Sequence, residues 1–117
     1  MPASPEPAAP GAEHPDEPDD VVFAALADAT RRRVLRAVAE EGPVTATALA
    51  DRLPVTRQAI AKHLAVLRSA GLVEATRVGR ETRFTVVSAP LDELAAWAQA
   101  AGRRWDARLE RLRRRFS

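Results

Sequence analysis

The sequence predicts a mainly α-helical fold that carries one small β-hairpin. From residue 22 to residue 70, and again after residue 90, apolar residues recur at steps of three and four, as in helices with one buried face. Between residues 72 and 87 apolar and polar residues instead alternate around Gly79–Arg80, which is typical of a hairpin turn. We therefore expect two helices, two further helices with room for a short strand before them, two strands and a last helix.

The first 20 residues differ from the rest in composition and charge. They hold six acidic residues and no Lys or Arg, and six of the nine prolines fall in residues 1–18. Such a segment buries too little apolar surface to offset its ordering entropy. We expect residues 1–20 to be a disordered acidic tail and residues 21–117 to form one domain.

The predicted domain is strongly basic. Residues 21–117 carry 18 basic and 10 acidic residues, a net charge of +8, although the whole chain has a net charge of only +2. Such an excess attracts polyanions, usually nucleic acid, although a merely soluble basic surface would have the same charge. The absence of cysteine excludes disulfides, thiolate metal sites and cysteine nucleophiles. Without a signal peptide or an apolar run of roughly 20 residues, we expect a cytoplasmic protein with no membrane partner.

Two helices are expected at the start of the domain. Val22, Phe23 and Leu26 form the apolar stripe of the first helix. Asp28 and Thr30 indicate a break and the N-cap of the second helix. We expect the second helix to bury Val34, Leu35 and Val38 and to keep its arginines in water, namely Arg31, Arg32, Arg33 and Arg36.

A helix-turn-helix pattern follows. Thr45 or Thr47 can cap a helix that runs to about Leu53, and Thr56 is placed to cap the next helix. Gly71 supplies the left-handed residue that ends that second helix. Two short helices joined by a three- to four-residue turn form a helix-turn-helix, and a hairpin directly after them forms the wing of a winged helix-turn-helix.

In the hairpin, Gly79 and Arg80 are expected at the tip. We expect alternation along the strands to place Arg77 and Arg83 on one face, directed at phosphates.

The last helix, which opens at Pro90, carries an apolar stripe longer than a domain of this size can cover. Leaving a large apolar side chain in water forfeits roughly 1.5–3 kcal/mol. We therefore expect this helix to pair with its symmetry mate and with the first helix in a homodimer, with packing along its own domain as the alternative. The expected interface comprises Val22, Phe23, Leu26, Leu91, Leu94, Trp97, Ala98, Ala101, Trp105, Leu109 and Leu112.

Three segments together resemble the ArsR/SmtB family of bacterial winged-helix repressors. They are residues 26–35 (LADATRRRVL), 45–53 (TATALADRL) and 55–73 (VTRQAIAKHLAVLRSAGLV), followed by residues 78–84 as the wing. The resemblance implies a dimer that occupies operator DNA and changes its affinity when an inducer binds.

Many members of that family sense metal ions, through cysteines in the third helix or an Asp/His set on the last helix. Here Thr45 and Ala46 occupy the third-helix position, the last helix has no histidine, and His63 is the single histidine in the predicted domain. One histidine without neighbouring ligands cannot assemble a tetrahedral zinc site. Metal sensing is therefore not carried over, no cofactor is expected, and any small-molecule effector stays unknown.

In a winged helix the fourth helix enters the major groove. Arg57 can pair with guanine and Gln58 with adenine, each good pair discriminating by about 1–3 kcal/mol. His63 follows the core-facing residues, so a structural role is the first interpretation for it and a phosphate contact the second. The predicted DNA contacts are Thr45, Thr47, Thr56, Arg57, Gln58, Ala61, Lys62, His63, Arg77, Arg80 and Arg83.

The sequence thus favours a repressor that binds double-stranded DNA at an inverted repeat. Two alternatives stay open, namely a winged helix that binds proteins through an exposed apolar patch, and a non-specific architectural DNA-binding protein. An enzyme is not expected, because Ser69, Ser88 and Ser117 have no plausible His or Asp partners and no glycine-rich phosphate loop is present.

Overall fold

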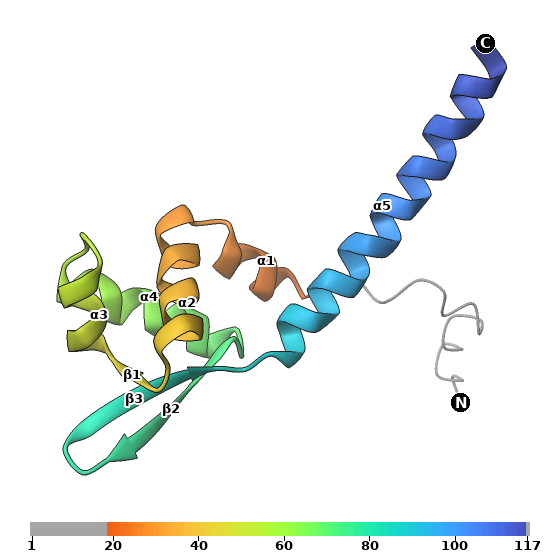
Figure 1. Ribbon diagram of the computed structural model, residues 1–117. Helices are drawn as coiled ribbons and strands as arrows, with labels where there is room; N and C mark the ends of the chain where they lie inside the picture. The colour runs from red at the N-terminus through yellow and green to blue at the C-terminus, as the bar shows by residue number, and fades with distance from the viewer. Residues whose placement is uncertain (1–18, 117) are drawn as a thin grey trace, which may run out of the picture. The chain divides into compact units, whose positions relative to one another are not determined.

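The computed structural model describes residues 19–116, so most of the predicted acidic tail lies outside the described range. Residues 19–91 and residues 92–116 belong to two separate units (Figure 1). The elements are α1 (Asp20–Leu26), α2 (Ala29–Glu41), β1 (Val44–Thr45), α3 (Ala46–Arg52), α4 (Arg57–Ser69), β2 (Val73–Val78), β3 (Glu81–Val86) and α5 (Ala89–Phe116). This order confirms the predicted winged helix-turn-helix.

The first described helix begins one residue before the predicted start of the domain. Helix α1 starts at Asp20, with Asp19 as its N-cap residue, whereas the domain was predicted to begin at residue 21. The two carboxylates that suggested a continuing acidic tail instead lie at the positive end of the helix dipole, where negative charge is favourable.

The core of the first unit is built from one apolar face of each helix. Leu49 of α3 and Ile60, Leu64 and Leu67 of α4 are at most 1% exposed, and they pack with Val34 and its neighbours on α2. Because α4 is anchored along this one face, its opposite face is presented to solvent in a fixed orientation.

Side-chain caps define the helix-turn-helix. Thr45 Oγ1 accepts a hydrogen bond from the N–H of Ala48, and Thr56 Oγ1 accepts one from Ala59, each at 3.1 Å. Gly71 has a positive φ of 76° and ends α4. These three predictions are confirmed: Thr45 rather than Thr47 caps α3.

The cap of α2 was only partly predicted. Asp28 Oδ1 accepts a hydrogen bond from the N–H of Arg31 at 2.9 Å, so Asp28 is the N-cap. Thr30, the expected cap, already lies inside the helix, because the helical backbone begins at Ala29.

The arginines at the start of α2 are not simply in water. Arg31 Nη1 donates to the carbonyls of Ala25 at 3.2 Å and Ala24 at 3.4 Å, and Arg32 Nη1 donates to that of Leu26 at 2.6 Å. These carbonyls end α1, where the helix dipole favours positive charge. The two arginines therefore fasten α1 to α2, which corrects the expectation of a fully solvated basic face.

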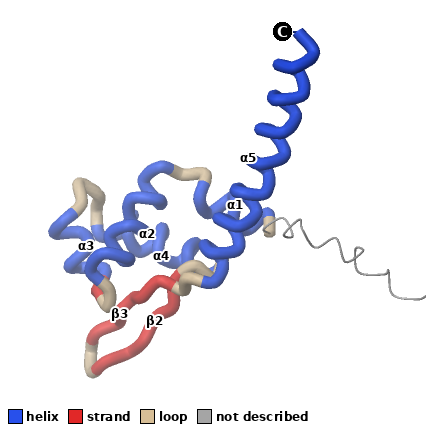
Figure 2. Tube along the Cα trace, turned by 45° about the vertical axis from the view of Figure 1, so that its right-hand side comes forward, coloured by secondary structure: helices blue, strands red, loops and turns tan. Residues whose placement is uncertain are grey.

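The three strands form an antiparallel sheet in the order β1-β3-β2, with the β2–β3 hairpin as the wing (Figure 2). Phe84 lies opposite both Val44 and Ala75, and it packs against the core. Gly79, with a φ of 63°, and Arg80 form the predicted two-residue turn. The wing is thus fixed to the helices at its base, while its tip is exposed.

The prediction that Arg77 and Arg83 share a face of the wing is wrong. Arg77 lies opposite Thr82, whereas Arg83 lies opposite Thr76. Directly opposite residues share a face, and neighbours along a strand alternate. Arg77 therefore lies on the face of Thr82 and Phe84, and Arg83 lies on the other face.

One residue of the predicted dimer interface belongs to the protomer's own core. Val22 is 7% exposed and packs in the core cluster, because α1 turns this side toward α2. The exposed large apolar residue of α1 is its neighbour Val21, at 56%. Leu26 and Leu91 pack at the edge of the core.

The described part of the second unit is α5 from residue 92 onward. Leu94, Trp97, Ala98 and Ala101 follow one another at helical spacing along one strip. The side chains of three further predicted interface residues, Trp105, Leu109 and Leu112, lie outside the described part. No helix among the described residues is long and apolar enough to cross a membrane.

Candidate nucleic-acid interface

The first two turns of α4 present a polar face to solvent. The exposed residues are those predicted to face DNA: Thr56, Arg57, Gln58, Ala61 and Lys62. Ile60 and Leu64, between and after them, are buried, so the helix has a clear inner and outer side. The predicted exposure of these residues is therefore confirmed, and their contact with DNA stays a prediction.

A shallow hollow of about 480 Å³ lies on this face of α4. Gln58, Ala61 and Lys62 line it, together with Thr56 and Ala59. Gln58 offers one acceptor and two donors and Lys62 offers three donors, while the small side chain of Ala61 between them leaves room for a flat group. Such a surface can hydrogen-bond to base edges.

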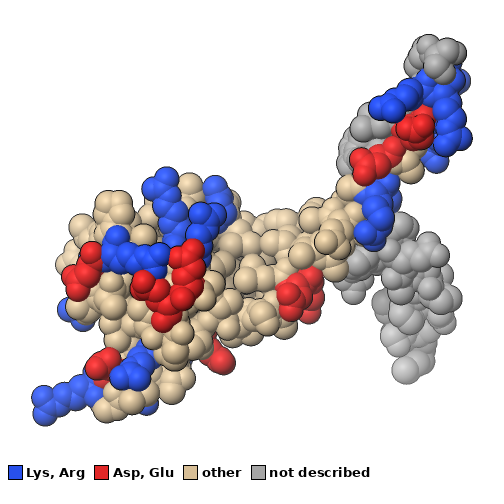
Figure 3. Space-filling view, viewed as in Figure 1, with Lys and Arg blue, Asp and Glu red and all other residues tan. Residues whose placement is uncertain are grey.

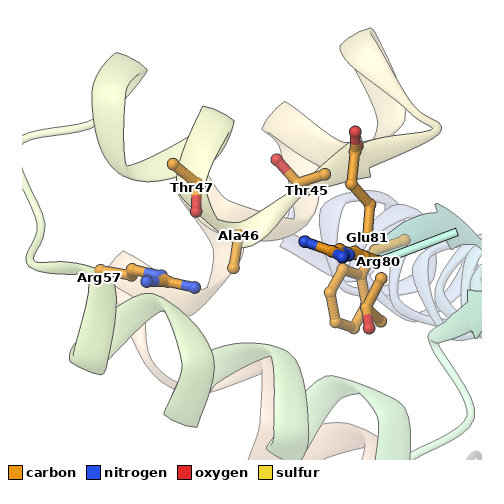
Figure 4. A pocket seen from close by; sticks show the side chains of 8 residues that line it. Thr45, Ala46, Thr47, Arg57, Arg80 and Glu81 are labelled. Carbon is orange, nitrogen blue, oxygen red and sulfur yellow. The ribbon is translucent and has the colours of Figure 1, made fainter. Parts of the chain in front are cut away.

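A second, larger hollow of about 580 Å³ lies between the start of α3, the start of α4 and the wing (Figure 4). We call it the α4–wing cleft. Arg57 from α4 and Arg80 from the wing tip are directed into it from opposite sides, and Ala46 and Thr47 lie between them. Its lining residues are Thr45, Ala46, Thr47, Arg57, Arg80, Glu81, Thr82 and Phe84.

The two arginines of the cleft are free cations. Among the residues that the structure describes, neither Arg57 nor Arg80 has a hydrogen-bond or ion-pair partner. The other wing arginines are engaged, since Arg77 Nε donates to the carbonyl of Gly79 at 3.1 Å and Arg83 Nε lies 3.5 Å from Glu81 Oε2. Two unpaired guanidinium groups facing one opening form a site for an anion.

The two threonines of the cleft differ in what they can still bind. Thr45 Oγ1 already accepts the capping bond, but its O–H remains able to donate. Thr47 is exposed and keeps its full hydrogen-bonding capacity among the described residues. Both hydroxyls can therefore donate to an anion in the cleft.

His63 is placed apart from the cleft. It is partly buried, and its Nδ1 is buried without a hydrogen-bond partner among the described residues, so it is not the satisfied structural histidine that was expected. It lies near Asp28, whose pKa is held below its ordinary value mainly by the hydrogen bond from Arg31 N–H, with the charges of His63 and Arg31 adding. His63 thus belongs to the α2–α4 junction.

Sequence reasoning missed four residues that line the cleft, namely Ala46, Glu81, Thr82 and Phe84. Glu81 was detectable, because it follows Arg80 directly in the predicted turn. The others required the pairing of β1 with β3. Among the described residues, no group of three or more His, Cys, Asp or Glu is placed to hold a metal ion.

Comparisons with known proteins agree with this geometry. Residues 26–76 match a helix-turn-helix domain family. A comparison with curated proteins found no match. Among solved structures, an ArsR-like transcriptional regulator from Rhodococcus sp. RHA1 is 45% identical, with a TM-score of 0.69 over 80% of this chain and 88% of that chain.

Two further solved structures are similar. A possible transcriptional regulator for arsenical resistance is 34% identical, with a TM-score of 0.59 over 66% of this chain and 79% of that chain. A cadmium metal-sensor from Mycobacterium tuberculosis is 41% identical, with a TM-score of 0.50 over 56% of this chain and 67% of that chain. The shared elements and identities show that this chain belongs to the ArsR family of helix-turn-helix transcriptional regulators, which bind double-stranded DNA and are not enzymes.

Proposed function

We propose that this protein is a sequence-specific repressor that binds an inverted-repeat operator as a homodimer. The observation that carries the proposal is the pair of unpaired arginines, Arg57 and Arg80, that face each other across the α4–wing cleft. Two unpaired guanidinium groups in one cleft contribute little to the stability of the fold, whereas the phosphates of a DNA backbone can bind both of them.

The position of the cleft suits the DNA backbone. When a recognition helix lies in the major groove and a wing reaches the adjacent minor groove, the phosphodiester strand that separates the grooves passes between them. In this protein that path runs through the cleft. Arg57 and Arg80 then bind phosphate oxygens from two sides, and Thr45 and Thr47 donate hydroxyl hydrogen bonds.

The same geometry divides the residues of α4 by role. The sequence suggested a guanine contact for Arg57, but its direction into the cleft supports a phosphate contact instead. Gln58 and Lys62, on the other hollow of α4, are left to contact base edges, with Ala61 between them. Base contacts specify the sequence and phosphate contacts fix the register.

The homodimer is supported by one exposed apolar side chain of α1 and by the apolar strip of α5. Val21 of α1 is exposed, and Leu94, Trp97 and Ala101 form a strip along α5. A two-fold dimer would present two α4 helices to half-sites about 34–36 Å apart. We place the protein in the cytoplasm, where it meets DNA, and the repressor role follows from the family resemblance.

The test is fluorescence anisotropy with the DNA upstream of the protein's own gene and a scrambled fragment of equal length, across a salt series. Tight binding to the upstream fragment alone, weakening steeply with salt, is expected. Equal binding to both fragments would favour an architectural DNA-binding protein. Binding to neither would favour the protein-interaction alternative.

A matched pair of variants links the result to the cleft. Arg57→Ala should weaken binding to both fragments, because phosphate contacts carry no sequence information. Arg33→Ala removes the same charge from the exposed surface of α2, outside the cleft, and should leave binding nearly unchanged. Sedimentation of the free protein, with a mass near twice 12.7 kDa expected, tests the dimer.

A further inference from the structure

We propose that Glu81 lowers the affinity of this protein for the DNA backbone at every sequence, by placing a carboxylate in the α4–wing cleft. The inference rests on the proposed function, because it takes the cleft to be the phosphate site. It concerns how strongly that site holds DNA.

The position of Glu81 is the first observation. It directly follows Arg80 in the chain and is the one acidic residue among the eight that line the cleft. Figure 4 shows its side chain next to Arg80 and extending toward the side of Thr45. A phosphate bound between Arg57 and Arg80 therefore has one acidic residue among those that surround it.

Pairing within the wing does not account for this carboxylate. Its ion pair is with Arg83 Nε at 3.5 Å, and the two side chains are 56% and 41% exposed. An exposed pair at that distance contributes little to stability. The ion pair therefore gives the negative charge of Glu81 little role in the stability of the wing.

The charges around the cleft indicate a different role for this carboxylate. Arg57 and Arg80 attract a phosphate, and the like charge of Glu81 opposes part of this attraction. The phosphodiester backbone is the same at operator and non-operator DNA, so the repulsion weakens both complexes by a similar factor. The ratio of the two affinities is then kept, while the residence time on DNA is shortened.

The experiment compares Glu81→Gln with Glu74→Gln in the full chain, by anisotropy on operator and scrambled DNA. Glu74 is exposed, lies on the same face of the hairpin and undergoes the same change in charge, but it does not line the cleft. Glu81→Gln should raise the affinity for both fragments roughly threefold to tenfold at low salt, and less as salt screens the charge. Glu74→Gln should have a clearly smaller effect.

A second comparison addresses Arg83, which Glu81→Gln also releases from its ion pair. In an Arg83→Gln background, Glu81→Gln should give the same gain in affinity. If the gain disappears there, it comes from the released arginine and the proposal is overturned. Equal gains in affinity for Glu81→Gln and Glu74→Gln would also overturn it. So would a loss of affinity for the operator alone, because that result would indicate that Glu81 contacts a base.

Failure of the proposed function would look different. If the wild-type chain binds neither DNA fragment, the DNA-binding proposal fails, whatever Glu81 does. Elution from immobilised heparin, a polyanion without bases, then still compares the two variants. Glu81→Gln should elute at higher salt than Glu74→Gln, and identical elution would contradict a carboxylate that opposes anion binding in the cleft.

Discussion

Arg52 and Arg57 lie five residues apart, on opposite sides of the turn of the helix-turn-helix, yet their surroundings differ completely. Arg52 Nη2 lies 2.6 Å from Glu40 Oε2, and its Nη1 pairs with Glu41, so it joins the end of α3 to the end of α2. The pKa of Arg52 is raised, chiefly by the bond to Glu40. Figure 3 shows basic and acidic side chains intermingled over these helices.

Among the described residues, Arg57 has no such partner, nor has Arg80 on the wing tip. Figure 3 shows basic side chains at the free end of the hairpin. A phosphate that approached Arg52 would have to compete with two carboxylates, whereas a phosphate in the cleft would meet two free guanidinium groups. Ion pairing with carboxylates therefore distinguishes arginines that stabilise the fold from arginines that are available to bind DNA.

The largest effect on DNA binding is expected when the unpaired arginines are removed. The double variant Arg57→Ala/Arg80→Ala removes both cations of the cleft, and we expect the affinity for operator and scrambled DNA to fall on the order of 100-fold at low salt. The melting temperature should change little, because neither side chain makes a hydrogen bond or an ion pair among the described residues. Anisotropy and thermal unfolding check this, and a loss below about threefold would mean that the cleft is not the phosphate site.

The next prediction concerns the backbone that presents Arg80. Gly79 and Gly71 both have positive φ, and a Cβ at either position would meet no atom within 4 Å. An Ala substitution therefore imposes the same kind of backbone strain at both positions, and only the position in the fold differs. Each should cost about 1 kcal/mol of stability. Because Gly79→Ala also displaces Arg80, it should weaken DNA binding roughly tenfold.

Gly71→Ala is the matched control for that variant, because its strain falls at the end of α4 and leaves the wing tip unchanged. Urea unfolding measures the shared cost and anisotropy measures the difference. Equal DNA affinities for the two variants would show that the wing tip does not hold DNA in a fixed conformation.

The paired side is tested by releasing Arg52. Glu40→Gln/Glu41→Gln leaves Arg52 with no carboxylate, and we expect the melting temperature to fall by a few degrees, on the order of the effect of one modest interaction in a small domain. DNA affinity should change less than about twofold, because a free cation outside the cleft meets no phosphate in the specific complex. A gain as large as the loss from Arg57→Ala would remove the distinction between the two regions.

The smallest expected effect is on stability alone, and it comes from the charge of the Asp28 carboxylate. Because the pKa of Asp28 is lowered from 3.8 in the folded chain, its stabilising effect is present at neutral pH and is lost as the pH falls through that lowered pKa. Asp28→Asn should therefore be less stable than wild type at pH 7 and should lose less stability between pH 5 and pH 2.5. Urea unfolding across this range checks it, and parallel curves would contradict the role of the carboxylate.

Local signals predicted much of the fold. Thr45, Thr56 and Gly71 act within one helical turn, and the Gly79–Arg80 turn depends on its own backbone, so their roles were readable from neighbouring residues. The exposed face of α4 followed from its 3.6-residue period in the same way. Such features need no knowledge of the rest of the chain.

What was missed depends on contacts between distant segments. The two residues of β1 are too few to show a period, and their pairing with β3 closes one side of the α4–wing cleft. The side-chain hydrogen bonds of Arg31 and Arg32 to α1 need the packing of two helices. The face of the wing that was predicted for Arg83 was wrong, because this face depends on the register between the two strands of the hairpin. The ion pairing of Arg52, and its absence at Arg57 among the described residues, likewise depend on tertiary structure.

The most direct test of the central claim is the slope of log affinity against log salt concentration for wild type, Arg57→Ala, Arg80→Ala and Arg52→Ala. Each phosphate contact contributes about 0.9 to that slope. We predict that Arg57→Ala and Arg80→Ala each reduce it by close to 0.9 per protomer, about twice that in a dimer, and that Arg52→Ala leaves it unchanged. Unchanged slopes for the two cleft variants, or an equal reduction for Arg52→Ala, would contradict the claim that the unpaired arginines of the cleft bind the DNA backbone.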